Sequence, residues 1–193
     1  MPTPNPHALQ ALLQRLSVPS RLLGEPGPDE AQVHTLLTAA VRVPDHGKLT
    51  PWRFIRIRGD ERRKLGDVLA ARQLERDPSA APAVVEKDRQ RFDHAPLVLA
   101  VVATLVPGHK VPEQEQLLSA GCSCFSLLQA AQALGFGAQW LTGWAAYDAV
   151  VAARLGLVGH ERLVGFVHIG TPREPAPERP RPDPLSLLSD WKG

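Results

Sequence analysis

The sequence predicts one globular domain, or one domain with arms, in which helices alternate with a few short strands. A chain of 193 residues with 44% hydrophobic content is long and apolar enough to form a proper core. Apolar residues recur at helical spacing in several segments, and short apolar runs between loops mark the strands. One stretch organises the rest, because residues 116–147 contain no charged side chain.

The first part of this uncharged stretch, Leu117–Leu134, predicts one long helix. At 1.5 Å per residue it is about 27 Å long, which is close to the width of a small domain. One subunit is therefore not expected to cover the whole surface of this helix. We therefore expect it to be buried on nearly every side and to lie at a subunit interface. Small residues permit close helix approach, and these are Ser119, Ala120, Gly121, Ser123 and Ser126. A transmembrane helix is the alternative, but polar residues are spread around the segment and no basic flank anchors it.

The other helices follow from apolar spacing and from cap residues. They are predicted at His7–Leu16, Glu30–Val41, Glu61–Glu75, Ala83–Phe92 and, after Asp148, in a short segment that ends at Leu155. Asp29 and Asp148 can cap the second and the last of these helices. Pro19 and Pro44 follow the first two, and proline disfavours helix in the residue before it.

Strands are predicted at Phe54–Ile57, Leu97–Ala103, Ala138–Leu141 and Leu163–Ile169. The first has charge on one face, whereas Leu97–Ala103 is an apolar run suited to a buried strand. Gly135 and Gly137 end the long helix before the third strand. A polar loop, residues 42–52, precedes the first strand and contains two prolines and a glycine. Functional side chains often lie on such loops.

The C-terminal segment, residues 172–193, differs from the rest of the domain. Its prolines predict an extended arm, and they are Pro172, Pro175, Pro177, Pro180, Pro182 and Pro184. The arm ends in an apolar patch of Leu185, Leu187, Leu188 and Trp191. A disordered tail is one interpretation. Docking of the arm on a partner subunit would bury the apolar end, and it is the interpretation we favour.

Composition and motifs exclude several functions. The net charge is +2 with no extended basic face, so nucleic acid is not the expected partner. Cys122 and Cys124 are expected to be small buried side chains on one helix, and no signal peptide is recognisable, which predicts a reducing, cytoplasmic setting. No Rossmann fingerprint, P-loop or nucleophile elbow occurs, and the histidines show no metal-ligand spacing. A hydrolytic or metal cluster of Asp45, His46 and His109 stays open as a minor alternative.

Four arginines on loops, near hydroxyls and turns, indicate a different chemistry. Arg15, Arg21, Arg42 and Arg173 are residues of the type that holds a phosphate by forked hydrogen bonds. From the residues alone, we predict a phosphate-bearing ligand bound at a dimer interface.

Several short motifs in a fixed order carry a family resemblance. They are Arg15-x-Ser17, Arg42-Val43-Pro44-Asp45-His46, Pro51-Trp52-Arg53-Phe54, His109-Lys110-Val111-Pro112-x-x-Glu115-Gln116, Ser119-Ala120-Gly121-Cys122, Gly135-Phe136-Gly137, Trp140-x-x-Gly143, Val164-Gly165-Phe166 and Gly170-Thr171-Pro172. They occur in the same order over most of the chain, from Arg15 to Pro172. This combination resembles the nitroreductase family of flavoproteins, and most closely its short YdjA-like branch.

The resemblance implies a fold, an assembly and a cofactor. The fold would be α+β, with a central antiparallel or mixed sheet flanked by helices, in an intertwined homodimer that holds one FMN at each of two interface sites. The residues that would bind FMN are Arg15, Leu16 and Ser17 at the phosphate and ribityl end, Arg42 and His46, and Leu141, Thr142 and Gly143 along the flavin. Ala131, Gln132, Ala133, Leu134, Gly135 and Phe136 match the stretch assigned to the nicotinamide cofactor in close relatives.

The resemblance also implies an activity. The protein would be an FMN-dependent oxidoreductase that passes hydride from NAD(P)H through flavin N5 to a nitroaromatic, a quinone or a similar acceptor. A non-catalytic flavin-binding or regulatory dimer is the alternative. The chain departs from the family where Leu16 replaces a second arginine and Pro19 accompanies an insertion before Arg21, so which arginine reaches the phosphate is open. Many members also bind phosphate with basic residues after the Gly-x-Pro turn, which makes Arg173 a candidate, with a plain surface charge as the alternative. Trp52 is expected in the core, with stacking near the flavin or the substrate as the alternative, and Trp140 is expected to serve packing only. Lys110 and Glu115 either border the site or form an exposed pair.

Overall fold

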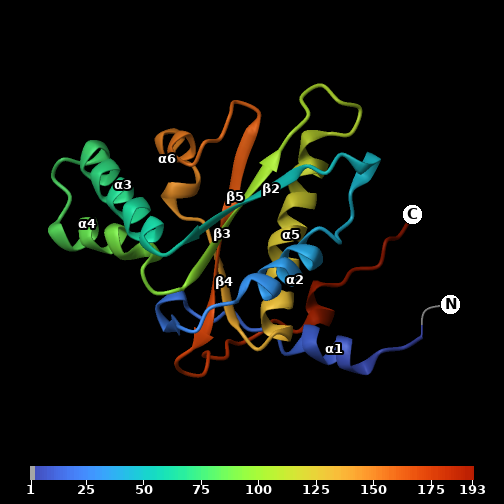
Figure 1. Cartoon of the computed structure of the whole chain (residues 1–193). Coiled ribbons are helices and arrows are strands. Elements are labelled where there is room, and N and C mark those ends of the chain that lie inside the picture. The colour runs from blue at the N-terminus through green and yellow to red at the C-terminus, as the bar shows by residue number, and fades with distance from the viewer. Residues whose placement is uncertain (1–2) are drawn as a thin grey trace.

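The protein is a sheet between two helical layers. The structure, a computed structural model, describes residues 3–193. Figure 1 shows α2 (Glu30–Ala40) and α5 (Glu113–Ala133) on one side of the sheet, with α3 (Asp60–Arg76), α4 (Pro82–Arg89) and α6 (Ala149–Arg154) on the other. The short α1 (Pro6–Leu13) lies beside the end of α5.

All strand pairs are antiparallel, so the sheet is antiparallel rather than mixed. Its strands are β1 (Leu23–Gly24), β2 (Trp52–Arg58), β3 (Leu97–Thr104), β4 (Gly137–Leu141) and β5 (Glu161–Pro172). They lie in the order β1-β5-β3-β2, and β4 also pairs with β5. The four predicted strands are confirmed, and each extends beyond its predicted bounds at one or both ends. β4 pairs with β5 alone, and on its other edge Ala138 O accepts a hydrogen bond from Val18 N.

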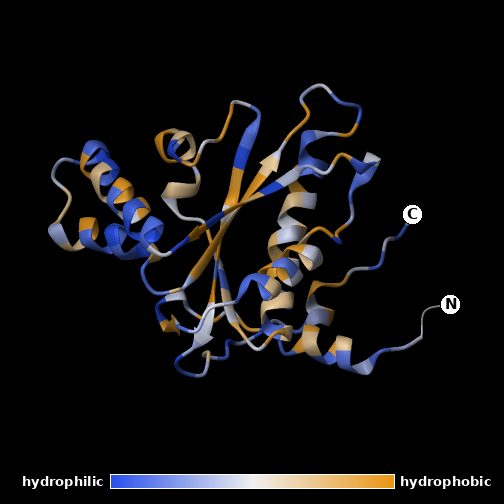
Figure 2. Ribbon diagram, in the orientation of Figure 1, coloured by the Kyte–Doolittle hydropathy of each residue, from blue (hydrophilic) through white to orange (hydrophobic). Residues whose placement is uncertain are grey.

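Alternation along β3 divides the core in two. Leu97, Leu99 and Val101 pack with α2 and α5, whereas Val98 and Ala100 pack with α3 and α6. Successive side chains of a strand point to opposite faces, and both faces of this strand are apolar because both are covered. Figure 2 shows the resulting apolar centre of the molecule.

The capped helices agree with the sequence. Asp29 forms a capping box with Gln32, and Asp148 accepts hydrogen bonds from the first turn of α6. Three helix ends were predicted wrongly. α5 begins at Glu113, four residues before the predicted Leu117, because the prediction followed the uncharged run whereas the first turn of the helix carries Glu113 and Glu115. α1 stops at Leu13 instead of Leu16, because it buries none of its residues and the chain turns so that Val18 N can donate to Ala138 O at 3.0 Å. The predicted helix 83–92 is α4 followed by a separate 3₁₀ turn at Gln90–Phe92, which places the Phe92 ring 4.9 Å from that of Phe166.

The long helix α5 is covered by its own chain on one side only. The prediction that it is buried on nearly every side is therefore wrong for a single chain, because Leu118 is 61% exposed and Phe125 is 44% exposed. Cys122 lies on the same side and is exposed, contrary to the expectation of a buried thiol. Cys124 points into the core, and burial raises the pKa of its thiol to about 12. The surface of α5 therefore carries an apolar stripe at helical spacing, formed by Leu118, Cys122 and Phe125.

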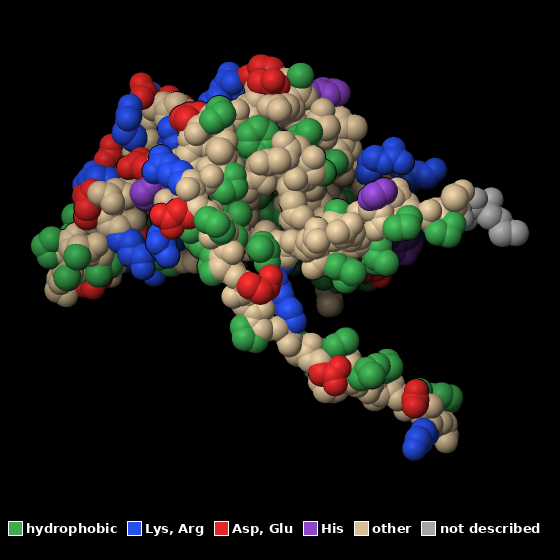
Figure 3. All heavy atoms as spheres, turned by 90° about the horizontal axis from the view of Figure 1, so that it is seen from below, with side chains coloured by type: hydrophobic (Ala, Val, Ile, Leu, Met, Phe, Trp, Pro, Cys, Tyr) green, Lys and Arg blue, Asp and Glu red, His purple; other side chains and the backbone are tan. Residues whose placement is uncertain are grey.

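The C-terminal segment extends from the body of the molecule (Figure 3), with a short 3₁₀ turn at Pro184–Leu187. Its apolar side chains at Leu185, Leu187, Leu188 and Trp191 are all exposed. Among residues 3–193, no helix has the length and apolar character that a membrane crossing requires.

Candidate functional site

The predicted phosphate-binding segment lies at the start of β4. Arg15 Nη1 donates to Ser17 Oγ at 3.2 Å, and Leu16 lines a small cavity beneath the segment. The bond from Val18 N to Ala138 O fixes these residues against the edge strand. Arg15 and Ser17 are thereby placed near the start of β4.

The predicted flavin-lining segment lies at the other end of β4. Leu141 is the last residue of the strand, and Gly143 follows with φ 68°, a conformation that favours glycine. Leu141 lines a cavity of about 760 Å³. The polar residues around this cavity include Ser20, Arg21, Lys87, Arg91, His94 and Gln139.

The side of this cavity that α4 and the residues after it form was not predicted from the sequence. Lys87, Arg91 and His94 lie on α4 and on the turn and loop that follow it, more than 40 positions before β4 in the chain. Their only sequence signal is a high density of basic residues on an otherwise ordinary surface helix. Together with Arg21, the cations Lys87 and Arg91 outnumber the single carboxylate of the lining, Glu86. The cavity is therefore suited to an anionic ligand.

A buried histidine stands behind this wall. His168 is 1% exposed, and its ring stacks on Phe92 with centroids 5.7 Å apart. Burial, together with the charges of Arg91 and His94, lowers the pKa of His168 to about 4. Its ring nitrogens have no hydrogen-bond partner among residues 3–193. His168 is therefore neutral near pH 7 and adds no charge to the cavity.

Arg42 and His46 lie far from both of these segments. Their loop packs on the first turns of α5, where His46 Nδ1 lies 2.7 Å from Glu115 Oε2 and Ser119 Oγ donates to Pro44 O at 2.5 Å. Arg15 instead lies near the last turns of the helix, where Gln132 contacts α1. The 21 residues of α5 separate the two groups by about 30 Å. A single chain therefore does not bring the whole predicted set together.

The stretch predicted for the nicotinamide cofactor, Ala131–Phe136, is the end of α5 and the turn after it. Ala131 is fully buried, and Gly135 with φ 83° ends the helix. Gln132, Gly135 and Phe136 line the same small cavity of about 240 Å³ as Leu16, not the larger cavity at Leu141. Ala133 is exposed.

Of the remaining candidate site residues, some line the large cavity and others do not. Arg21 lines the large cavity, whereas the side chain of Arg173 packs against Gly24, away from it. Trp52 is buried, as predicted, but Trp140 is 36% exposed and donates from Nε1 to Val164 O.

The other loop residues have partners of their own. Lys110 is exposed, and Glu115 pairs with His46 rather than with Lys110. Asp45 accepts hydrogen bonds from Leu49 N and Thr50 N, and His109 Nδ1 accepts one from Val111 N. Both side chains therefore stabilise the loops in which they lie, by hydrogen bonds to the main chain.

Comparison with known proteins agrees with this architecture. The model of the nitroreductase family matches residues 12–171. The Escherichia coli K12 protein named "Putative NAD(P)H nitroreductase YdjA" is 38% identical over 169 residues, which cover 86% of this chain and 88% of that protein. The crystal structure of a nitroreductase-like family protein from Bacillus cereus superposes with a TM-score of 0.81 over 100% of both chains, at 22% identity. A Desulfovibrio desulfuricans structure described as a putative nitroreductase in complex with FMN has a TM-score of 0.72 over 99% of this chain and 100% of that one, at 25% identity. The chain belongs to the nitroreductase family.

Proposed function

We propose that the protein is an FMN-dependent oxidoreductase that uses NAD(P)H to reduce a nitroaromatic, a quinone or a similar small acceptor. The observation that carries the proposal is the cationic cavity at Leu141, at one end of β4, near whose other end Val18, next to Ser17, is hydrogen-bonded to Ala138. Family membership supplies the reaction class. FMN, when bound, supplies the hydride transfer itself, so the protein needs no acid or base of its own.

The residues present fit this cofactor. The cavity volume of about 760 Å³ lies within the range of about 300–1,000 Å³ typical of cofactor sites. Arg21 and Lys87 provide positive charge for an anionic cofactor, and Leu141 provides an apolar surface for a planar ring. Gly143 has no side chain to keep a ligand away from the main chain. In the proposed site, Arg15 and Ser17 hold the phosphate end, and the Leu141–Gly143 segment lines the ring.

We further propose that two subunits complete each site. Arg42 and His46 lie at the N-terminal end of α5, whereas Arg15 and Ser17 lie at its C-terminal end. If two α5 helices pack antiparallel about a two-fold axis, each pair meets the opposite pair of the other subunit. The exposed stripe of Leu118, Cys122 and Phe125, at positions i, i+4 and i+7, supports such packing.

The C-terminal arm belongs to the same proposal. Leu185, Leu187 and Leu188 are at least 70% exposed and Trp191 is 91% exposed, so the described chain leaves the apolar end of the arm uncovered. Docking on a partner subunit would remove this surface from water. We retain the nicotinamide assignment only for Ala133 and Gly135 in the stretch 131–136, because these residues are exposed. A cytoplasmic location, where NAD(P)H is supplied, completes the proposal.

The first experiment is a visible absorption spectrum of the freshly purified protein, with mass analysis of whatever heat denaturation releases. We expect a flavin spectrum and FMN at about one per subunit. Stopped-flow reduction by NADH and NADPH then separates an enzyme from a non-catalytic flavin-binding dimer. Fast bleaching by either nucleotide supports the proposal. A protein that stays colourless and refuses added FMN would refute it.

A further inference from the structure

Arg91 lies directly against the loop that follows β4. A Cβ atom added to Gly143 would lie only 2.7 Å from Arg91 Nη1, so the guanidinium group packs on the glycine main chain. Arg91 also lines the large cavity next to Leu141. The structure therefore places a cation where this loop meets the cavity.

A buried carboxylate holds that cation in position. Arg91 Nη2 donates to Asp88 Oδ1 at 2.6 Å, and Asp88 is only 4% exposed. The same carboxylate accepts from Trp144 Nε1 at 3.1 Å and 3.2 Å, and Trp144 is the residue after Gly143. Asp88 thus joins the guanidinium group and the loop through charge-assisted hydrogen bonds.

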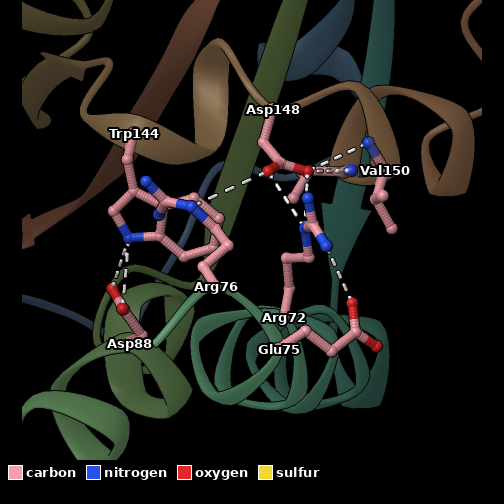
Figure 4. Close-up of polar contacts among 8 residues, drawn as sticks. Arg72, Glu75, Arg76, Asp88, Trp144, Asp148 and Val150 are labelled. Atoms are coloured by element: carbon pink, nitrogen blue, oxygen red, sulfur yellow. Dashed lines mark hydrogen bonds and ion pairs between the residues drawn. The ribbon is translucent and has the colours of Figure 1, made fainter. Parts of the chain in front are cut away.

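The far side of Trp144 is held as well. The Arg76 guanidinium carbon lies 4.4 Å from the centroid of the indole ring, and Arg76 Nε lies 4.0 Å from Asp148 Oδ2. Figure 4 shows Trp144 between Asp88 on α4 and Arg76 on α3. The loop is therefore fixed from two helices before any ligand binds, which lowers the entropy cost of binding.

Arg91 keeps donors for a ligand. Among residues 3–193 it donates a hydrogen bond only through Nη2, so Nη1 and Nε have no protein acceptor. The Arg91 side chain is 21% exposed at the cavity wall, and its guanidinium group can donate to an oxygen or a ring nitrogen.

We propose that Arg91 is a flavin-binding residue that donates to the pyrimidine edge of the FMN ring, and that Asp88 and Trp144 position it. The inference rests on the proposed function. The ring is favoured over the phosphate because Ala138, beside the phosphate segment, and Leu141 lie three residues apart on β4, about 10 Å at 3.3 Å per residue. A fixed positive charge beside the ring stabilises the reduced cofactor, which carries negative charge on that edge.

The test compares FMN with riboflavin, which lacks the phosphate. We expect Arg91→Met in the full-length, flavin-stripped protein to weaken both ligands by about tenfold, because a charge-assisted hydrogen bond is lost. The midpoint potential of bound FMN should become more negative, and Arg91→Lys should recover most of that shift. Weakened FMN with unchanged riboflavin would move Arg91 to the phosphate and overturn the proposal, as would unchanged binding of both.

Arg63→Met is the matched control. Arg63 lies on α3, pairs with Asp60 on the surface, and does not line the cavity. It should change neither affinity nor potential. If Arg91→Met fails to fold because Asp88 is left buried and unpaired, Asp88→Asn/Arg91→Met is compared with Asp88→Asn alone. A wild-type protein that binds neither FMN nor riboflavin would refute the proposed function itself. If the wild-type protein binds both flavins and the Arg91 variants bind them equally well, only the inference about Arg91 is refuted.

Discussion

Arg53 and Glu161 form a two-point ion pair across the end of the sheet. Arg53 Nε lies 2.6 Å from Glu161 Oε1, and Nη2 lies 2.7 Å from Oε2, although β3 separates their two strands. The Glu161 carboxylate is 6% exposed and also accepts from Val158 N at 3.0 Å. The pair fastens the edge strand β2 to the loop that leads into β5.

This pair predicts a pH-dependent stability. The hydrogen bond from Arg53 lowers the pKa of Glu161 from 4.5 to about 2, so its contribution is present above pH 4.5 and is lost as the pH falls toward 2. Arg53→Met should lower the free energy of unfolding by about 2 kcal/mol at pH 7. Urea unfolding should show this difference shrinking below pH 4.5. Arg63→Met, on an exposed pair with Asp60, serves as control, and an equal loss at pH 3 and pH 7 would contradict the assignment.

Gly66 is required where α3 meets α4. A Cβ atom at this position would lie 1.9 Å from Arg89 O, closer than any real contact. Gly66→Ala should therefore lower the free energy of unfolding by about 3 kcal/mol through overpacking. Gly159→Ala is the control, because a Cβ there meets nothing within 4 Å. An unchanged denaturation midpoint for Gly66→Ala would show that the two helices are packed less closely.

Arg42→Ala should weaken FMN binding by about tenfold, since a charge-assisted contact is lost. Lys64→Ala, on the exposed face of α3, should leave it unchanged. A mixing experiment then tests whether sites are shared between subunits. Coexpressed Arg15→Ala and Arg42→Ala chains form one intact site in each mixed dimer, so about a quarter of all sites should bind with wild-type affinity. Recovery of no such sites would mean that Arg15 and Arg42 act within one chain, or not together.

Phe125→Asp should dissociate the proposed dimer, because a charge on the exposed stripe of α5 would be buried unpaired. Analytical ultracentrifugation should show a monomer, and Cys122 should become reactive toward a thiol reagent. Cys124 should stay unreactive at pH 8, because burial raises its thiol pKa to about 12. Leu74→Asp, at an exposed position of α3 on the other side of the sheet, is the control. A wild-type protein that sediments as a monomer would overturn the interface.

Much of the fold could be predicted from local patterns. Strands such as Leu97–Ala103 are apolar runs, and capping aspartates such as Asp29 act within three residues, so both signals lie in short stretches of sequence. The ends of α1 and α4 could not be predicted, because the contacts of Val18 and Phe92 that decide them lie more than 70 residues away. The exposure of Cys122 could not be predicted either, because it depends on which side of α5 is covered by the rest of the chain.

The sequence by itself determined the family, the order of elements and the polar segments at Arg15–Ser17, Arg42–His46 and Leu141–Gly143, because their signals are local or lie in motif order. Only the tertiary structure decided that α5 separates Arg42 from Arg15 within one chain, and that Arg91 lies against Gly143. Distance across a helix and contact between an α4 turn and a β4 loop depend on how remote segments pack. No local pattern of residues encodes them.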